Sequence, residues 1–256
     1  MVGNLFTPHS SSMKLKKSSF YIVLVVAFSS SAVSAQSQQN DTSFTPISIN
    51  NAIEVYHQMI NKASGLYNGT QYGNYFFSFE EGSPYFGVKD SVPGSILYDG
   101  VLYRNILMKY DEVKDVIVIW NNNDAIQLLN EKVGNFKLLD HSFIRLIKDN
   151  RSRELVSSGF YEQLYTGKIA VLKKVIKTIM ERTDMTEGIL RRIDQKTYFY
   201  LQTARGYIPV KNKGNLIEAL QDHKDEIRKF ISSHDLGIKK DPDGFLVQVA
   251  AYYDTL

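Results

Sequence analysis

From residue 95 onward, hydrophobic and polar positions alternate in short runs, and turn-forming residues lie between these runs. Such runs are typical of β-strands joined by hairpins. The expected strands cover residues 95–98, 101–103, 106–110, 116–120, 125–129, 132–138, 142–148, 160–165, 168–176, 197–203 and 207–210. No helix-length segment separates them. Because parallel strands need such crossovers, the pattern predicts an antiparallel meander of hairpins.

Three stretches carry more specific signals. The run at 116–120 (VIVIW) is apolar at every position, which predicts a strand buried on both faces. Pro209 lacks an N–H to donate, so its strand is expected at an edge of the sheet. Residues 178–182 fit either a continued strand or the start of a helix. Residues 184–195 (DMTEGILRRIDQ) have no clean period and are interpreted as a charged loop.

Helical periods occur at both ends of this region. Spacings of three and four predict a short N-terminal helix, whose apolar stripe is Ile49, Ala52, Ile53, Tyr56 and Ile60. Similar stripes predict about three small helices within 211–256, with Asp222 capping one and Asp241, followed by Pro242, capping the last. We therefore expect a β-rich α+β fold, with a helix and antiparallel sheet over 47–210 and C-terminal helices packed on the sheet.

The N-terminus has the three-part order of a secretory signal peptide. Lys14, Lys16 and Lys17 precede an apolar run of nine residues at 20–28, and small residues end at Ala35. A membrane anchor is the alternative, but about 20 apolar residues are needed to span a bilayer. We expect cleavage after residue 35, a flexible leader over 36–46, and no integral membrane span in the remaining chain. Met13 lies directly before the basic region and is an alternative start.

Charge and cysteine content exclude several classes of function. The chain has 30 basic and 27 acidic side chains, and residues 1–35 contain three lysines and no acids, so their removal leaves 27 of each. A neutral chain lacks the positive field that nucleic-acid binding uses. The basic stretch 168–196 is interpreted as a solvated face. The absence of cysteine excludes disulfides and thiolate chemistry.

No constellation of catalytic or metal-binding residues stands out. The histidines after residue 35 are His57, His141, His223 and His234, and none shows a metal-ligand spacing. There is no nucleophile elbow and no glycine-rich phosphate loop, so we predict no catalytic residues, no metal and no cofactor. The adjacent acids at 80–81 and 111–112 are expected to point apart, whereas general acid/base work needs convergent groups.

Aromatic residues are dense between residues 72 and 86, within a glycine-rich stretch. Rings in such a stretch either pack into the core or form a platform that stacks on sugars or docks a partner. Core packing is the favoured interpretation, and recognition is the main alternative. The candidate recognition residues are Tyr67, Tyr72, Tyr75, Phe77 and Tyr85.

A Leu-Tyr-x-Gly tetrad occurs three times, at 66–69 (LYNG), 97–100 (LYDG) and 164–167 (LYTG). The spacings differ, so the tetrads are not one repeat period. Asn-Gly and Asp-Gly are preferred in type I′ hairpin turns, and extended residues flank the second and third copies. The tetrads are interpreted as hairpin turns, and only the copy beside the aromatic stretch retains a claim to function.

Longer segments show a resemblance. The runs ILYDGVLYRNILMKYD, KVGNFKLLDHSFIRLI and GFYEQLYTGKIAVLKKVIK, with LVQVAAYYDTL at the end, resemble exported proteins of unknown function from Bacteroidetes. The resemblance covers most of residues 50–256. It implies the Gram-negative envelope, periplasmic or extracellular, and implies no mechanism or catalytic residue.

These observations leave three hypotheses. The first is an exported envelope protein that binds or scaffolds without catalysis, with an envelope protein or a glycan as its partner. The second is an enzyme that acts on a glycan or another envelope polymer through acids and aromatics within 72–86. The third is a half-barrel that binds lipid in an apolar cavity.

Overall fold

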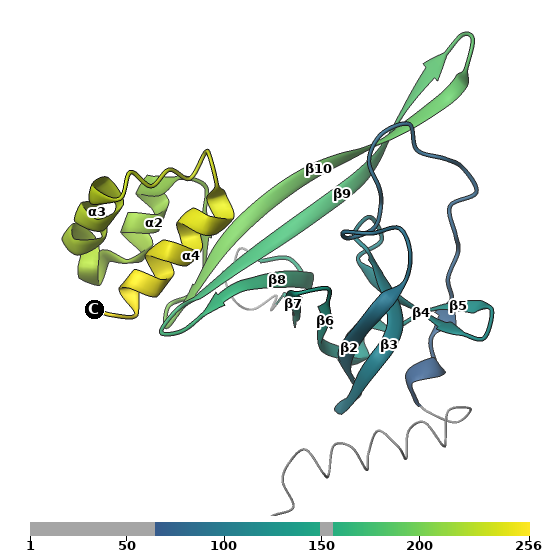
Figure 1. The fold of residues 1–256 in the computed structure, drawn as a ribbon, viewed down its shortest axis with the longest axis horizontal. Coiled ribbons are helices and arrows are strands. Elements are labelled where there is room, and N and C mark those ends of the chain that lie inside the picture. Colours follow the sequence, from purple (N-terminus) through teal and green to yellow (C-terminus); the bar gives the residue numbers. More distant parts are fainter. Residues whose placement is uncertain (1–64, 149–155) are drawn as a thin grey trace, which may run out of the picture. The chain divides into compact units, whose positions relative to one another are not determined.

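The computed structural model describes residues 65–148 and 156–256 (Figure 1). The expected signal peptide (1–35), leader (36–46) and N-terminal helix lie outside these residues and stay predictions. In the part of the chain that the structure describes, no helix is long and apolar enough to cross a membrane.

Eleven strands within the described residues form one antiparallel sheet. Across the sheet, the order is β1 (Thr70–Gln71), β5 (Asp124–Gln127), β4 (Val116–Asn121), β3 (Val101–Asp111), β2 (Val92–Tyr98), β6 (Val133–Leu138), β7 (His141–Leu146), β8 (Gly159–Thr166), β9 (Ala170–Asp184), β10 (Gly188–Thr203) and β11 (Gly206–Val210). Every neighbouring pair is antiparallel. The β-rich antiparallel prediction is confirmed.

The short β1 pairs with β5, and the predicted meander from β2 onward is interrupted at one link. Consecutive strands pair from β2 to β5 and from β6 to β11, but β6 pairs with β2 and not with β5. Between them the chain doubles back through Leu128, which is buried and whose N–H bonds to the Ile117 carbonyl, and through the 3-10 turn η2 (Asn130–Lys132). The prediction is wrong at this one link, because turn residues mark where a strand ends and not which strand it joins next.

Details within the sheet agree with the residue pattern. β3 joins two expected strands through a bulge, where Asn105 adopts a φ of 53° and the register moves from Ile96–Tyr103 to Gly94–Ile106. In β4, positions 116–119 are buried, which confirms a strand covered on both faces. β11 ends the strand order, so Pro209 does lie in an edge strand.

Residues 184–195, which the sequence predicts to be a charged loop, form the distal part of a β-hairpin instead. β9 and β10 form a hairpin that stays paired from Ala170–Gln202 out to Asp184–Gly188. At its tip, Asp184 accepts hydrogen bonds from the N–H groups of Thr186 and Glu187, and Gly188 has a φ of 81°. The alternation was hard to detect because this part of the hairpin is exposed at most positions of both strands.

Three α-helices follow the sheet, as predicted: α2 (Lys213–Ala219), α3 (Lys224–Ser233) and α4 (Pro242–Tyr253). The Asp241 side chain caps α4 by accepting from the Gly244 N–H, as predicted. Asp222 does not cap α3, because the 3-10 turn η3 (Gln221–His223) intervenes. Asp222 instead accepts a 2.6 Å hydrogen bond from the Tyr253 hydroxyl.

Two main hydrophobic clusters hold these elements. One lies within the β2–β8 region and contains a stacked ring pair, Phe136 and Phe143, whose centroids are 4.6 Å apart. The other joins the three helices to strand residues Val171, Leu201 and Val210. The helices therefore pack on the β9–β11 end of the sheet.

The three tetrads adopt three different structures. In the second, Asp99 and Gly100 both have positive φ, as a type I′ turn between β2 and β3 requires. The first overlaps the 3-10 turn η1 (Gly65–Tyr67), and a Cβ on Gly69 would lie 2.2 Å from the Gln127 carbonyl oxygen. Gly167 begins a three-residue loop and packs against the Asp254 carboxylate. The hairpin-turn interpretation is confirmed for the second and wrong for the first.

Candidate binding site

The aromatic stretch connects β1 to β2 and lies against the β9–β10 hairpin. The Glu80 N–H donates to the Arg191 carbonyl over 2.7 Å, and the Ile193 N–H donates to the Glu81 carbonyl over 2.9 Å. Gly82 follows with a φ of 81°, and a Cβ there would lie 2.8 Å from the Ile193 Cβ. The stretch thus adds a short strand-like segment to the outer edge of β10.

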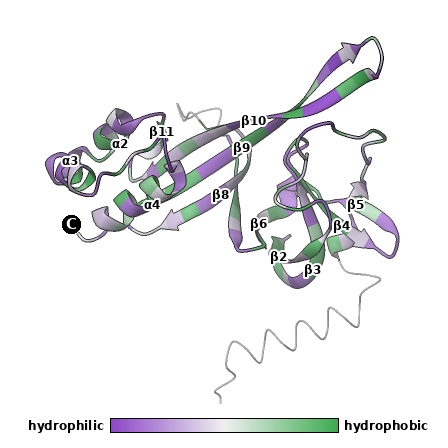
Figure 2. Cartoon of the chain, turned by 45° about the horizontal axis from the view of Figure 1, so that its top comes forward, coloured by the Kyte–Doolittle hydropathy of each residue, from purple (hydrophilic) through white to green (hydrophobic). Residues whose placement is uncertain are grey.

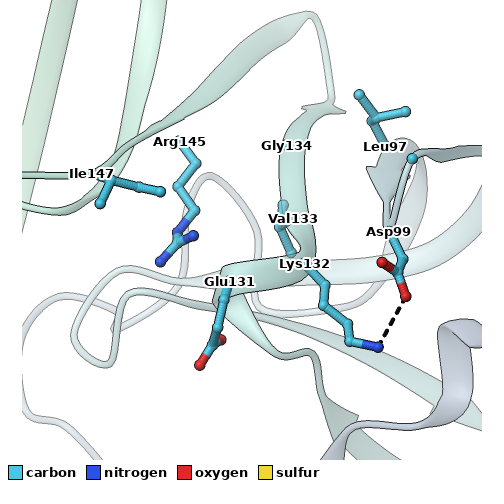
Figure 3. Close-up of a pocket in the computed structure, with 9 residues that line it drawn as sticks. Leu97, Asp99, Glu131, Lys132, Val133, Gly134, Arg145 and Ile147 are labelled. Atoms are coloured by element: carbon cyan, nitrogen blue, oxygen red, sulfur yellow. Dashed lines mark hydrogen bonds and ion pairs between the residues drawn. The ribbon is translucent and has the colours of Figure 1, made fainter.

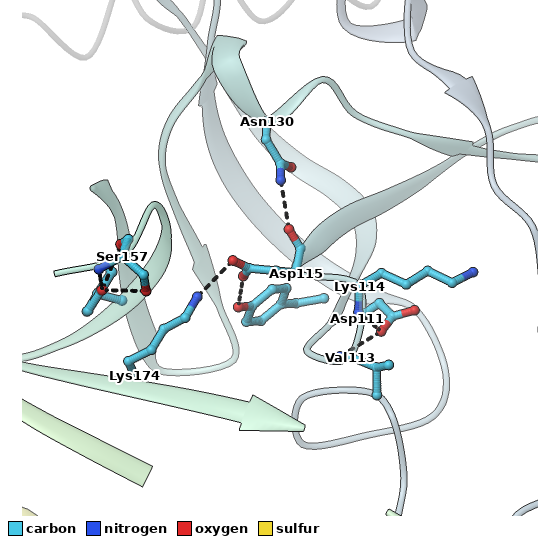
Figure 4. A network of polar contacts seen from close by, with 9 residues as sticks. Asp111, Val113, Lys114, Asp115, Asn130, Ser157 and Lys174 are labelled. Carbon is cyan, nitrogen blue, oxygen red and sulfur yellow. Dashed lines mark hydrogen bonds and ion pairs between the residues drawn. The ribbon is translucent and has the colours of Figure 1, made fainter. Parts of the chain in front are cut away.

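A buried carboxylate organises the beginning of this stretch. Asp111, at the end of β3, accepts hydrogen bonds from the Tyr72 hydroxyl at 2.8 Å and the Tyr75 hydroxyl at 2.9 Å. The same carboxylate accepts from the N–H groups of Val113 and Lys114, which closes the turn to β4 (Figure 4). Burial and Asp111 together raise the pKa of Tyr72 and of Tyr75, so both phenols are neutral donors.

Two lysines cover the faces of these rings. The buried Lys109 Nζ lies 4.0 Å from the Tyr85 ring centroid and 5.7 Å from that of Tyr72. The Lys114 Nζ lies 4.4 Å from the Tyr72 centroid and 4.7 Å from that of Tyr75. These are cation–π distances. The chain's own ammonium groups therefore lie where a sugar would stack on these rings from the same side.

The five predicted recognition residues separate into groups. Tyr72, Tyr75 and Tyr85 come together around Asp111 and Lys109. Phe77 packs against Tyr75, and the Arg191 guanidinium covers it at 4.1 Å. Tyr67 packs on the β2–β8 core instead. These contacts are internal, as the favoured core-packing interpretation expects.

Two lysines on β9 pair with acids at the β3–β4 turn. The Lys177 Nζ lies 2.7 Å from Glu112 and also donates to the carbonyls of Ser83 and Tyr85. The Lys174 Nζ lies 2.7 Å from Asp115, on the β3–β4 turn (Figure 4). Burial raises the pKa of Glu112 despite the hydrogen bond from Lys177. The interpretation of 168–196 as a solvated face is therefore wrong for these lysines, since their partners come from distant strands.

A second network surrounds Glu162 of β8. The His141 Nδ1 lies 2.5 Å from one oxygen of this buried carboxylate, and the Lys173 Nζ lies 3.2 Å from the other. Lys173 also pairs with Asp243 of α4 at 2.6 Å. A carboxylate that orients a histidine is half of a general-base arrangement, yet no described contact brings a hydroxyl nucleophile to His141. Nor do residues 65–148 and 156–256 contain a group of His, Asp and Glu side chains that could hold a metal ion.

An open pocket of about 380 Å³ lies beside the β2–β3 turn (Figure 3). Asp99 and Lys132 form an exposed ion pair of 2.9 Å at its wall, and Arg145 and Glu131 also line it. None of the predicted recognition residues lines this pocket. Its surface pairs opposite charges and contains no convergent acids.

The distal half of the β9–β10 hairpin has a different surface. β9 pairs with β8 only as far as Lys173, so its last eleven residues extend past that neighbour. Four apolar side chains on this part are exposed, with relative exposures of 41%, 45%, 104% and 54% for Ile176, Met180, Met185 and Ile189. Figure 2 shows hydrophobic and hydrophilic positions interspersed along it. This surface is the best candidate for binding a partner.

The sheet and its contacts define a β-rich α+β protein whose longest hairpin has an exposed distal half. A scan against protein-family models and searches of curated proteins and of solved structures found no match to the chain.

Proposed function

We propose that the chain is an exported protein of the Gram-negative envelope, related to uncharacterised exported proteins of Bacteroidetes, that binds and scaffolds a partner protein without catalysis. The signal-peptide pattern at residues 1–35 and the absence of cysteine support export to that compartment. The observation that carries the binding function is the exposed distal half of the β9–β10 hairpin.

A protein partner fits this surface better than a glycan does. Sugars stack on free aromatic faces, but Tyr72, Tyr75 and Tyr85 have cations on theirs. The hairpin instead presents Met180 and Met185, and flexible thioether side chains are common on protein-binding surfaces.

The alternative functions have less support. Glu80 is exposed and pairs with Arg182 at 3.1 Å, and Glu81 is also exposed, so these acids do not converge in a pocket as a glycan-cleaving enzyme requires. A lipid carrier needs an apolar cavity. The β2–β8 core contains instead closely packed rings, with Phe136 in contact with Tyr110, Phe143 and Phe160.

The test is affinity capture from envelope extract with the purified protein, followed by mass spectrometry of proteins and glycans. The hairpin variant Met185→Asp/Ile189→Asp is compared with Leu107→Asp, which charges an equally exposed apolar position on β3. We expect one protein partner to be retained by the wild type and the control and lost by the hairpin variant. Its binding should then be reproduced with purified components. Equal capture by all three proteins, or recovery of glycan alone, would contradict the proposal.

A further inference from the structure

The pocket beside the β2–β3 turn is lined by two charged side chains that have no partner. Four ionisable residues line it, of which Asp99 and Lys132 bind each other at 2.9 Å. The side chains of the other two, Glu131 and Arg145, form no ion pair or hydrogen bond with any residue in 65–148 and 156–256. Figure 3 shows Lys132 directed towards Asp99 and away from both of them. The pocket wall therefore offers a free cation and a free anion to a ligand.

Backbone contacts place these two side chains. Glu131 is exposed and lies in η2, where the carbonyl of its neighbour Lys132 accepts a 2.8 Å hydrogen bond from the Asp99 N–H. Arg145 is half-buried in β7, opposite Phe160 of β8. A guanidinium in this state keeps its planar fork of N–H donors available, and such a fork binds a carboxylate through both oxygens.

The rest of the lining is mainly apolar. Leu97, Val133 and Ile147 contribute to it, and Ile147 is 67% exposed. Gly134 lies where the register between β2 and β6 shifts, and a Cβ there would lie 3.1 Å from Leu97 Cδ2. The glycine thus leaves Leu97 uncovered on this side, as glycine in a strand often does where a ligand approaches.

The charges and the size of the pocket select a small zwitterion. A simple anion at Arg145 would share the pocket with the Glu131 carboxylate, and a simple cation at Glu131 would share it with the guanidinium. An α-amino acid has an ammonium and a carboxylate on one carbon and satisfies both groups. The volume of about 380 Å³ is near the lower limit for ligand pockets, which suits a single amino acid better than a peptide.

We propose that this pocket binds a free α-amino acid with an apolar side chain. Arg145 binds the carboxylate and Glu131 binds the ammonium. The side chain of the ligand lies against Leu97, Val133 and Ile147. This site is separate from the partner surface proposed for the hairpin, since none of its residues lies on β9 or β10. Because the pocket is open, we expect weak binding, with a Kd of about 0.1–1 mM.

The test is a nuclear magnetic resonance titration of the purified ¹⁵N-labelled protein with L-leucine, L-valine and L-phenylalanine. Gly100 and Gly134 line the pocket, so their amide signals report binding in place. We expect both signals to shift and to saturate with at least one of the three amino acids. The amide signal of Gly206, at the start of β11, should not move.

Two leucine derivatives separate the two charges. L-Leucinamide has no carboxylate and should bind about tenfold more weakly than leucine, because it loses the hydrogen bonds to the half-buried guanidinium. N-Acetyl-L-leucine has no ammonium and should bind about threefold more weakly, since Glu131 is exposed. These compounds also represent leucine at the N-terminus and the C-terminus of a peptide. Binding of either one as tightly as leucine would therefore overturn the proposal of a free amino acid.

Variants match each charge of the ligand to a residue. Arg145→Gln should weaken leucine binding about tenfold without weakening leucinamide binding. Glu131→Gln should weaken leucine binding about threefold without weakening N-acetyl-leucine binding. A general disturbance of the pocket would weaken all the compounds alike. Lys137→Gln is the control, since it removes a charge from an exposed β6 position outside the pocket and should leave every Kd unchanged.

The absence of saturable shifts with all three amino acids up to about 10 mM would overturn the proposal. Equal loss of every compound in the Arg145 and Glu131 variants would do the same. The titrations use pure protein and small molecules, whereas the proposed function is decided by capture of a protein from envelope extract. Failure of one is therefore distinct from failure of the other.

Discussion

Lys177→Met removes the cation from the most enclosed ion pair between β9 and the rest of the chain. The Lys177 and Glu112 side chains are 10% and 4% exposed, and their charged atoms lie 2.7 Å apart. Methionine retains the apolar length of the side chain but leaves the Glu112 carboxylate buried without a counter-ion. Removing one partner of a buried pair costs about 3–5 kcal/mol of unfolding free energy, and we expect that loss at pH 7.

The pH dependence of the stability loss shows whether the unpaired Glu112 carboxylate causes it. Burial already places the folded-state pKa of Glu112 above its ordinary value, and loss of Lys177 raises that pKa further. The folded state then binds a proton at Glu112 more readily than the unfolded state, so stability falls as pH rises from the unfolded towards the folded pKa. On lowering the pH from 7 to 5, the difference from wild type should shrink by at most about 1.4 kcal/mol per pH unit.

Urea unfolding at pH 5, 6 and 7 measures this difference. Lys196→Met is the control, since it removes an exposed lysine from β10 and should change the stability little. The double variant Glu112→Gln/Lys177→Met should recover part of the loss, because it leaves no buried charge. A penalty below about 1 kcal/mol, or one that is constant over this pH range, would refute the reasoning.

Two further predictions concern single side chains. Gly167→Ala places a Cβ within 1.7 Å of an Asp254 oxygen, so the carboxylate must move away from the Tyr165 hydroxyl and the Lys168 N–H that donate to it. We expect the free energy of unfolding, measured by heat or urea, to fall by about 1–3 kcal/mol. The control Gly73→Ala, whose Cβ would have no atom within 4 Å, should change the stability very little. Asp111→Ala leaves two tyrosine hydroxyls and two N–H groups without their acceptor and should lower the free energy of unfolding by at least about 3 kcal/mol. Asp184→Ala removes a similar carboxylate from the turn at the exposed hairpin tip and should lower it much less. Equal losses for the two variants would contradict the role assigned to Asp111.

The sequence predicted strands well where one face of the strand is buried and the other is exposed to solvent. It missed residues 188–195 because both faces of the distal hairpin are exposed and the apolar alternation fades. The Asp184 and Gly188 turn residues were the signal that could have identified this hairpin.

The polar networks were not predictable in the same way. Glu112 and Lys177 are 65 positions apart, and no local spacing in the sequence indicates that this buried acid forms an ion pair with a lysine of the basic stretch. Three of the aromatic candidates, Tyr72, Tyr75 and Tyr85, lie together in the structure, and their role in recognition stays a prediction. Only the structure reveals that Lys109 and Lys114 cover their faces.

By itself, the sequence determined the element types, most strand positions, the edge position of Pro209 and the Asp241 cap, because periodicity, turn residues and capping act over a few neighbouring positions. The tertiary structure decided that β6 returns to β2, which charges are buried together, and that β9 continues beyond the end of its pairing with β8. These features depend on contacts between residues far apart in the chain. Their energies come from burial and from backbone pairing between strands, which no local pattern records.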